Sequence, residues 1–547
     1  MAADLILSGG VVHTIAGPYS GLSGTRRLTS VAISGGRISA VGTDLSEHRG
    51  TRTRVIDLAG RLVLPGFQDS HAHPPMGGLE RIRCDLTSAK TLGASVEAVA
   101  RYAASTDAPW ILGGGWSMEA FPGGCPTAAS LDAIAGIGDR PVFLPNRDHH
   151  SAWVNSAALA LAGITADTPD PADGRIERDA GGAPTGALHE GAADLVERLI
   201  PAPSAAEQRR GLLVGQAYLH SLGITGWQDA WVTPETFEVY LDIARTGELS
   251  ARVVGCQWWE RSHDVEQIVG MVAQRARGPV GRFRPTAVKI MLDGVCETFT
   301  ASMLAPYLDG HGHATDNTGL RFVEAGDLAR YVTALDAEGF QVHMHALGDR
   351  GVRDALDAIA AARTANGVTD HRHQVAHLQV VDPADVARFG ALDATANAQP
   401  LWACAEPQMV DLTIPFLGAE RTAQQYPFAS IAGNGGRLAF GSDWPVSSPN
   451  PLEILHVAVT RTEPGAPVGT MPFLPDERLD LLQAVYACTM GSAWANHADD
   501  VTGSIEVGKY ADLVVLDRDI FAPDAGPLPD ARVDHTFVEG IEVYERR

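Results

Sequence analysis

Phe340-Gln341-Val342-His343-Met344-His345 has the apolar alternation of a buried β-strand, and residues 350–365 follow it with apolar side chains at helical spacing. His373-Gln374-Val375-Ala376-His377 then predicts a second strand. Residues 287–291 and 438–440 are further strand candidates in the same long middle section. Repeated strand–helix units predict an α/β fold with a parallel sheet, either closed as a barrel or left open.

Both ends of the chain carry short β-branched runs punctuated by glycine. Residues 1–64 and 499–547 therefore predict two parts of one small β-sandwich, with residues 65–498 as the domain between them. Residues 75–205 are too long for a single strand-to-helix connection and contain strand candidates of their own, such as 141–144. We expect these residues to form an insertion after the first strand, over the mouth of a closed sheet.

The bulk composition narrows the functional class. The chain has 547 residues, 45% of them hydrophobic, and a formal net charge of −24. An acidic surface repels phosphate, so we expect a small-molecule substrate and no binding to nucleic acid or membrane. Six cysteines lie far apart without a CxxC pair, which fits a reducing compartment, and we interpret the protein as cytoplasmic. A homodimer and a monomer both fit these numbers.

Histidines gather where strands are predicted to end. His71 and His73 follow an apolar run and are two residues apart, so in a strand both face the same side. An HxH pair alone is more often incidental than metal-binding. His345 and His377 each end a predicted strand, where the active sites of parallel barrels gather. Each could instead be a hydrogen-bonded core histidine, but several at successive strand ends favour a metal site.

Two charged residues occupy apolar strands or their ends. Asp443 follows residues 438–440, and a buried carboxylate there needs a partner such as a metal; the alternative is a turn-forming aspartate before Trp-Pro. Lys289 lies in an otherwise apolar strand. Its neutral amine could take up carbon dioxide and bridge two metals as a carbamate, or it could snorkel or pair with Asp293.

Four motifs together resemble a known family. Residues 65–73, Pro-Gly-Phe-Gln-Asp-Ser-His-Ala-His, are similar to the first-strand signature of the amidohydrolase superfamily. Residues 289–294, 345–350 and 441–446 resemble the amidohydrolase 3 family, which includes N-substituted formamide deformylases. The resemblance implies a TIM (β/α)8 barrel with a small β-sandwich formed by both termini. It also implies hydrolysis of carbon–nitrogen bonds outside ordinary peptides.

The resemblance also implies a ligand set. His71 and His73 match the first-strand ligands, and Lys289 matches the fourth-strand lysine that is carboxylated in many members. The remaining matches are His345 on the fifth strand, His377 on the sixth and Asp443 on the eighth. Within His343-Met344-His345 we select His345, because it directly precedes the Ala-Leu-Gly-Asp segment.

The expected chemistry is metal-dependent hydrolysis of an amide or N-substituted formamide. A divalent metal generates hydroxide near neutral pH, and Asp443 then serves as general base and acid. Zinc is the first expectation, with one or two ions, because imidazole and carboxylate ligands suit it. Iron, manganese and nickel are alternatives. Expected substrate-binding residues are Trp116, Glu190, Asp229, Trp444 and Arg461, with Trp231 and Trp402 as further wall candidates.

Rival functions use the same residues differently. A lactone, ester or phosphoester hydrolase would also use metal-activated hydroxide. A deaminase typically needs a glutamate shortly after the fifth-strand histidine, and Ala-Leu-Gly-Asp follows His345 instead. A noncatalytic binding or scaffold protein would be expected to have lost ligands, and all six positions are present. For His149 and His150 we favour a solvated surface over substrate contact.

Overall fold

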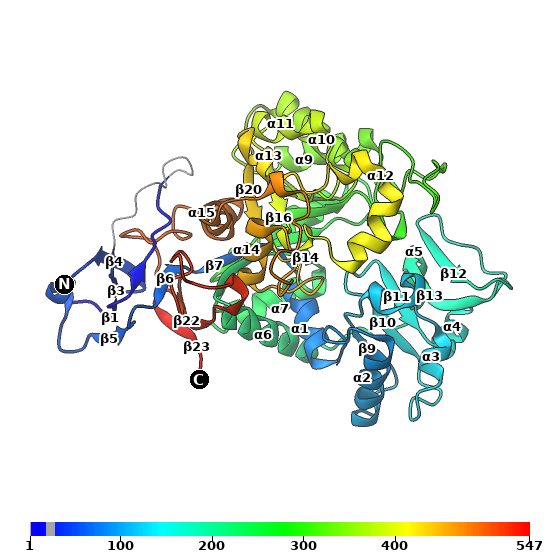
Figure 1. Ribbon diagram of the computed structural model, residues 1–547, viewed down its shortest axis with the longest axis horizontal. Coiled ribbons are helices and arrows are strands. Elements are labelled where there is room, and N and C mark those ends of the chain that lie inside the picture. Colours follow the sequence, from blue (N-terminus) through cyan, green and yellow to red (C-terminus); the bar gives the residue numbers. More distant parts are fainter. Residues whose placement is uncertain (1, 18–27) are drawn as a thin grey trace.

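The central sheet is a nearly closed barrel of eight parallel strands. The computed structural model describes residues 2–17 and 28–547, and each barrel strand pairs in parallel with the next. A parallel bridge between Ala72 and Trp444 brings the end of the last strand back to the first. The predicted α/β barrel is confirmed (Figure 1). In chain order its strands are β7 (Phe67–Ala72), β14 (Ile224–Val232), β15 (Arg252–Trp258), β16 (Phe283–Met291), β17 (Gln341–Ala346), β18 (Gln374–His377), β19 (Thr395–Ala398) and β20 (Arg437–Phe440).

Helices surround the barrel because their apolar faces pack on the strands. α10 (Asp349–Asn366) forms where residues 350–365 predict a helix, and it buries Val352, Leu356 and Ile359. No helix in the described part of the chain has the length and apolar character of a membrane span. The other helices outside the insertion are α6 (Ala205–Ser221), α7 (Pro234–Arg245), α8 (Gln267–Arg275), α9 (Ala325–Ala337), α11 (Pro383–Ala391), α12 (Ile414–Thr422), α13 (Phe428–Gly433), α14 (Pro451–Thr460), α15 (Leu481–Tyr486) and α16 (Ser492–Ala495).

Polar side chains fill the barrel interior and bond one another. The Gln228 amide donates to Gln341 Oε1 over 2.6 Å, and the Gln374 amide donates to Gln228 Oε1 over 2.9 Å. Asn397 in turn donates to Gln374 Oε1 over 2.7 Å. Mutually bonded buried amides fix the strands against one another. They therefore form a rigid floor below the strand ends.

Two small sheets are built from the ends of the chain: the first uses N-terminal strands alone, and the second joins strands from both ends (Figure 1). Leu7 and Val31 of the first sheet pack in one core with Val63 and Leu513 of the second. The small β-domain built by both termini is confirmed, while its boundaries at residues 64/65 and 498/499 stay predictions. The first sheet contains β1 (Leu5–Ser8), β3 (Ser30–Ser34), β4 (Arg37–Gly42) and β5 (Arg54–Asp57), and the second contains β2 (Val11–Val12), β6 (Leu62–Pro65), β21 (Leu513–Leu516), β22 (Val533–Val538) and β23 (Ile541–Glu545).

A third sheet lies between β7 and β14 in the chain and on the far side of the barrel from the terminal sheets (Figure 1). Its strand order is β12-β13-β11-β10-β9-β8, and a core of its own includes Leu86, Ile111 and Trp153. The elements of this insertion are β8 (Cys84–Asp85), β9 (Ile111–Gly114), β10 (Val142–Pro145), β11 (Ser151–Val154), β12 (Gly174–Arg178), β13 (Pro184–Glu190), α1 (Pro74–Ile82), α2 (Leu92–Ser105), α3 (Ala128–Asp132), α4 (Ser156–Ala162) and α5 (Gly191–Glu197).

Candidate metal centre

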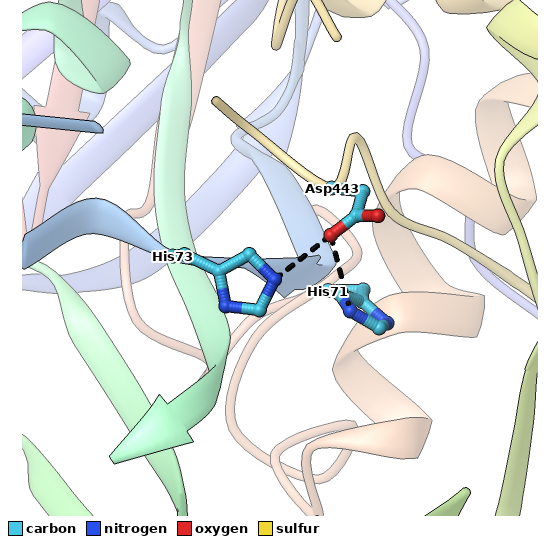
Figure 2. A group of neighbouring side chains, drawn as sticks. All are labelled: His71, His73 and Asp443. Carbon is cyan, nitrogen blue, oxygen red and sulfur yellow. Dashed lines mark hydrogen bonds and ion pairs between the residues drawn. The ribbon is translucent and has the colours of Figure 1, made fainter. Parts of the chain in front are cut away.

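His71, His73 and Asp443 meet at the carboxyl end of the barrel (Figure 2). His71 lies on β7, His73 precedes α1, and Asp443 follows β20 with a left-handed backbone (φ 56°). Asp443 Oδ1 lies 2.8 Å from His73 Nε2 and 3.2 Å from His71 Nε2. The amide of Asp443 donates to the carbonyl of His71, and the amide of His73 donates to the carbonyl of Trp444. These backbone bonds hold the three side chains together.

Three more of the predicted residues join this cluster. Lys289 Nζ on β16 lies 3.2 Å from His71 Nε2. The rings of His345 on β17 and His377 on β18 are 4.5 Å apart, and His377 Nδ1 lies 3.9 Å from an Asp443 oxygen. The structure therefore brings all six sequence-selected side chains to one place, and none is more than 8% exposed. The six side chains lie on, or just after, the first, fourth, fifth, sixth and eighth barrel strands, which are β7, β16, β17, β18 and β20.

Burial sets the charge state of the cluster. Loss of hydration, together with the charge of Lys289, holds the pKa of His71 and His345 well below the usual range. Burial likewise lowers the pKa of Lys289 to about 8. For Asp443, burial alone would raise the pKa, but the hydrogen bond with His73 and the nearby His377 outweigh it and lower the value to about 2. Neutral imidazoles beside one carboxylate are the form in which these groups bind metal ions.

Asp293 orients His345. Its carboxylate lies 3.1 Å from His345 Nδ1 and accepts backbone hydrogen bonds from Ser302, Leu347 and Gly348. The alternative in which Lys289 pairs with Asp293 is therefore wrong, since this carboxylate is already saturated. An acceptor on Nδ1 leaves His345 Nε2 available as a ligand, a common arrangement behind metal-binding histidines.

His343 was not selected from the sequence, but it lies directly below the cluster. Its Nε2 is 2.9 Å from His71 Nδ1, and its Nδ1 is 2.9 Å from Gln228 Oε1. His343 thus joins His71 to the polar floor of the barrel. The spacing of two residues in His343-Met344-His345 places both histidines on one face of β17, a signal that could have assigned both to the interior.

A cavity of about 490 Å³ opens above the cluster, between the barrel and the insertion. All six cluster residues line it, as does Glu190. This volume is in the range of small-molecule sites. Its aromatic wall contains Trp231 and Trp258, whose rings stack with centroids 4.6 Å apart. Trp231 was a wall candidate from the sequence, and Trp258 was not.

A histidine–glutamate pair from the insertion also faces this cavity. His150 Nδ1 lies 3.0 Å from both oxygens of Glu190, and Thr300 donates to Glu190 over 2.7 Å. The expectation that His149 and His150 are solvated is wrong, because both rings are largely buried and pair with Glu80 and Glu190. Folding of the insertion over the barrel creates this burial, which local sequence does not encode.

Four predicted substrate-binding residues do not line the cavity. Trp116 is fully buried in the insertion core, where its indole donates to the Leu144 carbonyl over 2.7 Å. The Trp444 indole packs against Gly77 of α1 and against Tyr218. These two assignments are corrected, because the indoles fill space between structural elements.

Arg461 and Asp229 likewise serve the scaffold. The buried Arg461 guanidinium donates to the carbonyls of Tyr426 and Phe473. Asp229 accepts hydrogen bonds from the Tyr240 hydroxyl and from the Trp231 amide. Asp229 therefore holds the backbone of a cavity-lining residue but does not reach the cavity itself.

Trp116→Phe tests the first correction. We expect a loss of about 2 kcal/mol in stability, because the Leu144 carbonyl loses its donor and the core loses volume. Activity per folded molecule should stay within twofold of wild type, since the ring lies outside the cavity. Thermal unfolding and steady-state kinetics on the same preparation measure both quantities. A large change in KM with unchanged stability would show that Trp116 contacts the substrate after all.

In (β/α)8-barrel enzymes the active site lies at the carboxyl ends of the strands. The cavity lined by histidines and an aspartate lies at that position in this barrel, which places the protein in this class. The chain belongs to the amidohydrolase family, whose profile matches residues 54–544. The resemblance stated from the four motifs is thereby confirmed.

Relatives match over nearly the whole chain. Protein LONG AFTER FAR-RED 3 of Arabidopsis thaliana is 31% identical, over 100% of this chain and 92% of that protein. The N-substituted formamide deformylase of Arthrobacter pascens is 29% identical, over 94% of this chain and 95% of its own length. The crystal structure of an uncharacterized metal-dependent hydrolase from Pyrococcus horikoshii OT3 shares the fold, with a TM-score of 0.72, 24% identity and coverage of 98% and 99%.

Proposed function

We propose that the protein is a metal-dependent hydrolase that cleaves a non-peptide carbon–nitrogen bond, of the amide or N-substituted formamide type. The observation that carries the proposal is the convergence of six buried ligand-type side chains beneath a cavity of small-molecule size. The Arthrobacter relative named for formamide deformylation supports this substrate class.

The donor set fits a divalent metal ion, with zinc as the first choice. His71, His73 and Asp443 each offer one ligand atom, and these three atoms lie within 4.8 Å of one another. His377 Nδ1 is buried without a hydrogen-bond partner among the described residues. Buried polar atoms normally have a partner, so this nitrogen is available to ligate a metal ion. His71, His73 and Asp443 would hold one ion, and His345, His377 and a carboxylated Lys289 would complete a second position.

A bound divalent ion lowers the pKa of a coordinated water and polarises a carbonyl oxygen. The chain supplies the proton chemistry. Asp443 accepts a proton from the attacking water at a carboxylate oxygen and returns it to the leaving nitrogen as the C–N bond breaks. His150 is held through Nδ1 by Glu190, which leaves Nε2 without a partner among the described residues. This nitrogen is available to contact a polar group of the substrate.

A hydrolysis panel tests the proposal. Zinc-loaded enzyme is given N-benzylformamide, an N-acetyl amine, a γ-lactone, 4-nitrophenyl phosphate and adenine. We expect formate and benzylamine to appear in equal amounts from the first compound. Turnover of only the lactone or the phosphate would contradict the proposal and identify the protein as a lactone or phosphoester hydrolase on the same fold. Ammonia release from adenine would favour the deaminase.

Replacement of Lys289 tests the second metal position. Lys289→Ala should lower the metal content per chain and decrease kcat about 100-fold, because a carbamate ligand is lost. Elemental analysis and kinetics are compared with Lys509→Ala, a lysine of the C-terminal region that bonds to the Asp499 carbonyl. Unchanged metal stoichiometry together with unchanged turnover in Lys289→Ala would eliminate the bridging role.

A further inference from the structure

Five carboxylates of the insertion line the cavity, namely Glu80, Asp148, Glu190, Asp194 and Glu197. Asp194 and Glu197 lie three residues apart on α5, so they project from the same face of that helix. Both side chains are exposed, and both line the cavity. Glu80 on α1 lines the same cavity but is only 7% exposed. We name Glu80, Asp194 and Glu197 the acidic wall.

Among the described residues, two of the three carboxylates of the acidic wall have no partner for their charge. Within residues 28–547, the side chains of Asp194 and Glu197 make no hydrogen bond or ion pair. Glu80 Oε1 lies 2.9 Å from His149 Nε2, but Glu80 Oε2 is buried without a hydrogen-bond partner in the same range. Although both side chains keep access to solvent, partial loss of hydration at the cavity, reinforced by neighbouring carboxylates, raises the pKa of Asp194 and of Glu197. A cation placed here would relieve both the repulsion and the missing contact.

The arginines that line the cavity are already engaged elsewhere. Arg83 donates twice to Glu207, over 2.9 and 2.7 Å. Arg261 lies 3.5 Å from Asp173 and covers the ring of Phe322 at 4.2 Å. Neither guanidinium is free to neutralise the acidic wall. His149 and His150 also line this side, and each is paired with a carboxylate, Glu80 and Glu190 respectively. Asp194 and Glu197 are therefore the carboxylates of the acidic wall whose negative charge remains for a ligand.

We propose that the acidic wall binds a positively charged group, such as a protonated amine, on a substituent of the substrate amide. This inference rests on the proposed function, because the metal cluster and the acidic wall line one cavity and would hold two parts of one molecule. The stacked indoles of Trp231 and Trp258 in the same lining suit an apolar or aromatic part of that molecule. A substrate that carries a carboxylate would meet like charge and be disfavoured.

Three matched formamides test the inference by turnover. They are N-benzylformamide, its 4-aminomethyl derivative, which is a cation at neutral pH, and its 4-carboxylate derivative, which is an anion. Wild-type enzyme should favour the cation over the anion by at least about tenfold in kcat/KM. Asp194→Asn/Glu197→Gln should reduce the cation-to-neutral ratio about tenfold. Glu47→Gln, at a carboxylate with 84% side-chain exposure, controls for general loss of charge and should leave that ratio unchanged.

A binding measurement decides the inference independently of catalysis. Titration calorimetry with benzyltrimethylammonium, a permanent cation with no group that can ligate a metal, should give about tenfold weaker binding to the double variant than to wild type or Glu47→Gln. Equal binding to all three proteins, or an undiminished preference for the cationic formamide in the double variant, would overturn the acidic-wall proposal. Hydrolysis of none of the three formamides would contradict the proposed function, and the calorimetry would then decide whether the acidic wall binds cations.

Discussion

Asp443→Asn is expected to lower kcat by roughly 10³–10⁴-fold on whichever amide the enzyme hydrolyses. Asparagine has nearly the same shape, so the backbone bonds that join residue 443 to His71 can persist. Its amide cannot take a proton from water or return one to the leaving nitrogen. KM should change far less than kcat, because the loss falls on the transition state and not on substrate binding.

A matched variant separates this effect from damage to the fold. Asp336→Asn changes another buried aspartate, on α9 at the opposite end of the barrel, where the carboxylate accepts hydrogen bonds from Asn366 and Thr369. It should lower the thermal midpoint and leave kcat within about twofold of wild type. An Asp443→Asn enzyme with a kcat close to that of wild type would show that another group transfers the proton.

Removal of both first-strand histidines is expected to abolish metal binding. His71→Asn/His73→Asn should leave less than about 0.1 metal ion per chain after dialysis and reduce activity at least about 10³-fold, because two ligands of one position disappear. Added zinc should not restore activity. Elemental analysis of the dialysed protein, followed by assay with and without zinc, measures both effects.

His220→Gln is the control for this pair. His220 is also buried, but it lies on α6 and contacts Ser250 and the carbonyl of Ile224, away from the cluster. It should retain wild-type metal content. If the double variant kept both its metal and its turnover, the ion would have to be held by other residues.

Much of the fold could be predicted because its signals are local. The alternating run at residues 340–345 and the helical pattern at 350–365 became β17 and α10 almost residue for residue. The spacing of two residues predicted that His71 and His73 face the same side at the end of one strand, and they lie at the end of β7 and directly after it. The apolar residues around Lys289 predicted a buried strand, which is β16. Closure of the sheet followed from the family motifs, because strand–helix repeats alone allow an open sheet.

The substrate side of the site could not be predicted in the same way. Trp116 and Trp444 have the composition of an aromatic wall, but the packing of the insertion and of α1 decides that they fill cores. His150 becomes buried only when the insertion folds over the barrel and brings Glu190 beside it. Such contacts join segments far apart in the chain, so no local pattern marks them.

The acidic wall shows the same dependence on tertiary structure. Asp194 and Glu197 lie in a stretch that reads as an ordinary solvated helix, and the acidic composition of the chain offers no reason to single them out. Their significance comes from the cavity that their helix borders. Charge within a cavity selects ligands, whereas the same charge on an open surface mainly affects solubility.

The most direct test of the central claim is an anomalous difference map from crystals of the zinc-loaded enzyme, with data collected on both sides of the zinc absorption edge. The proposed site predicts a strong peak among His71, His73 and Asp443, and a second one beside His345 and His377 if Lys289 is carboxylated. Fully active crystals whose zinc peaks all lie away from these residues would contradict it.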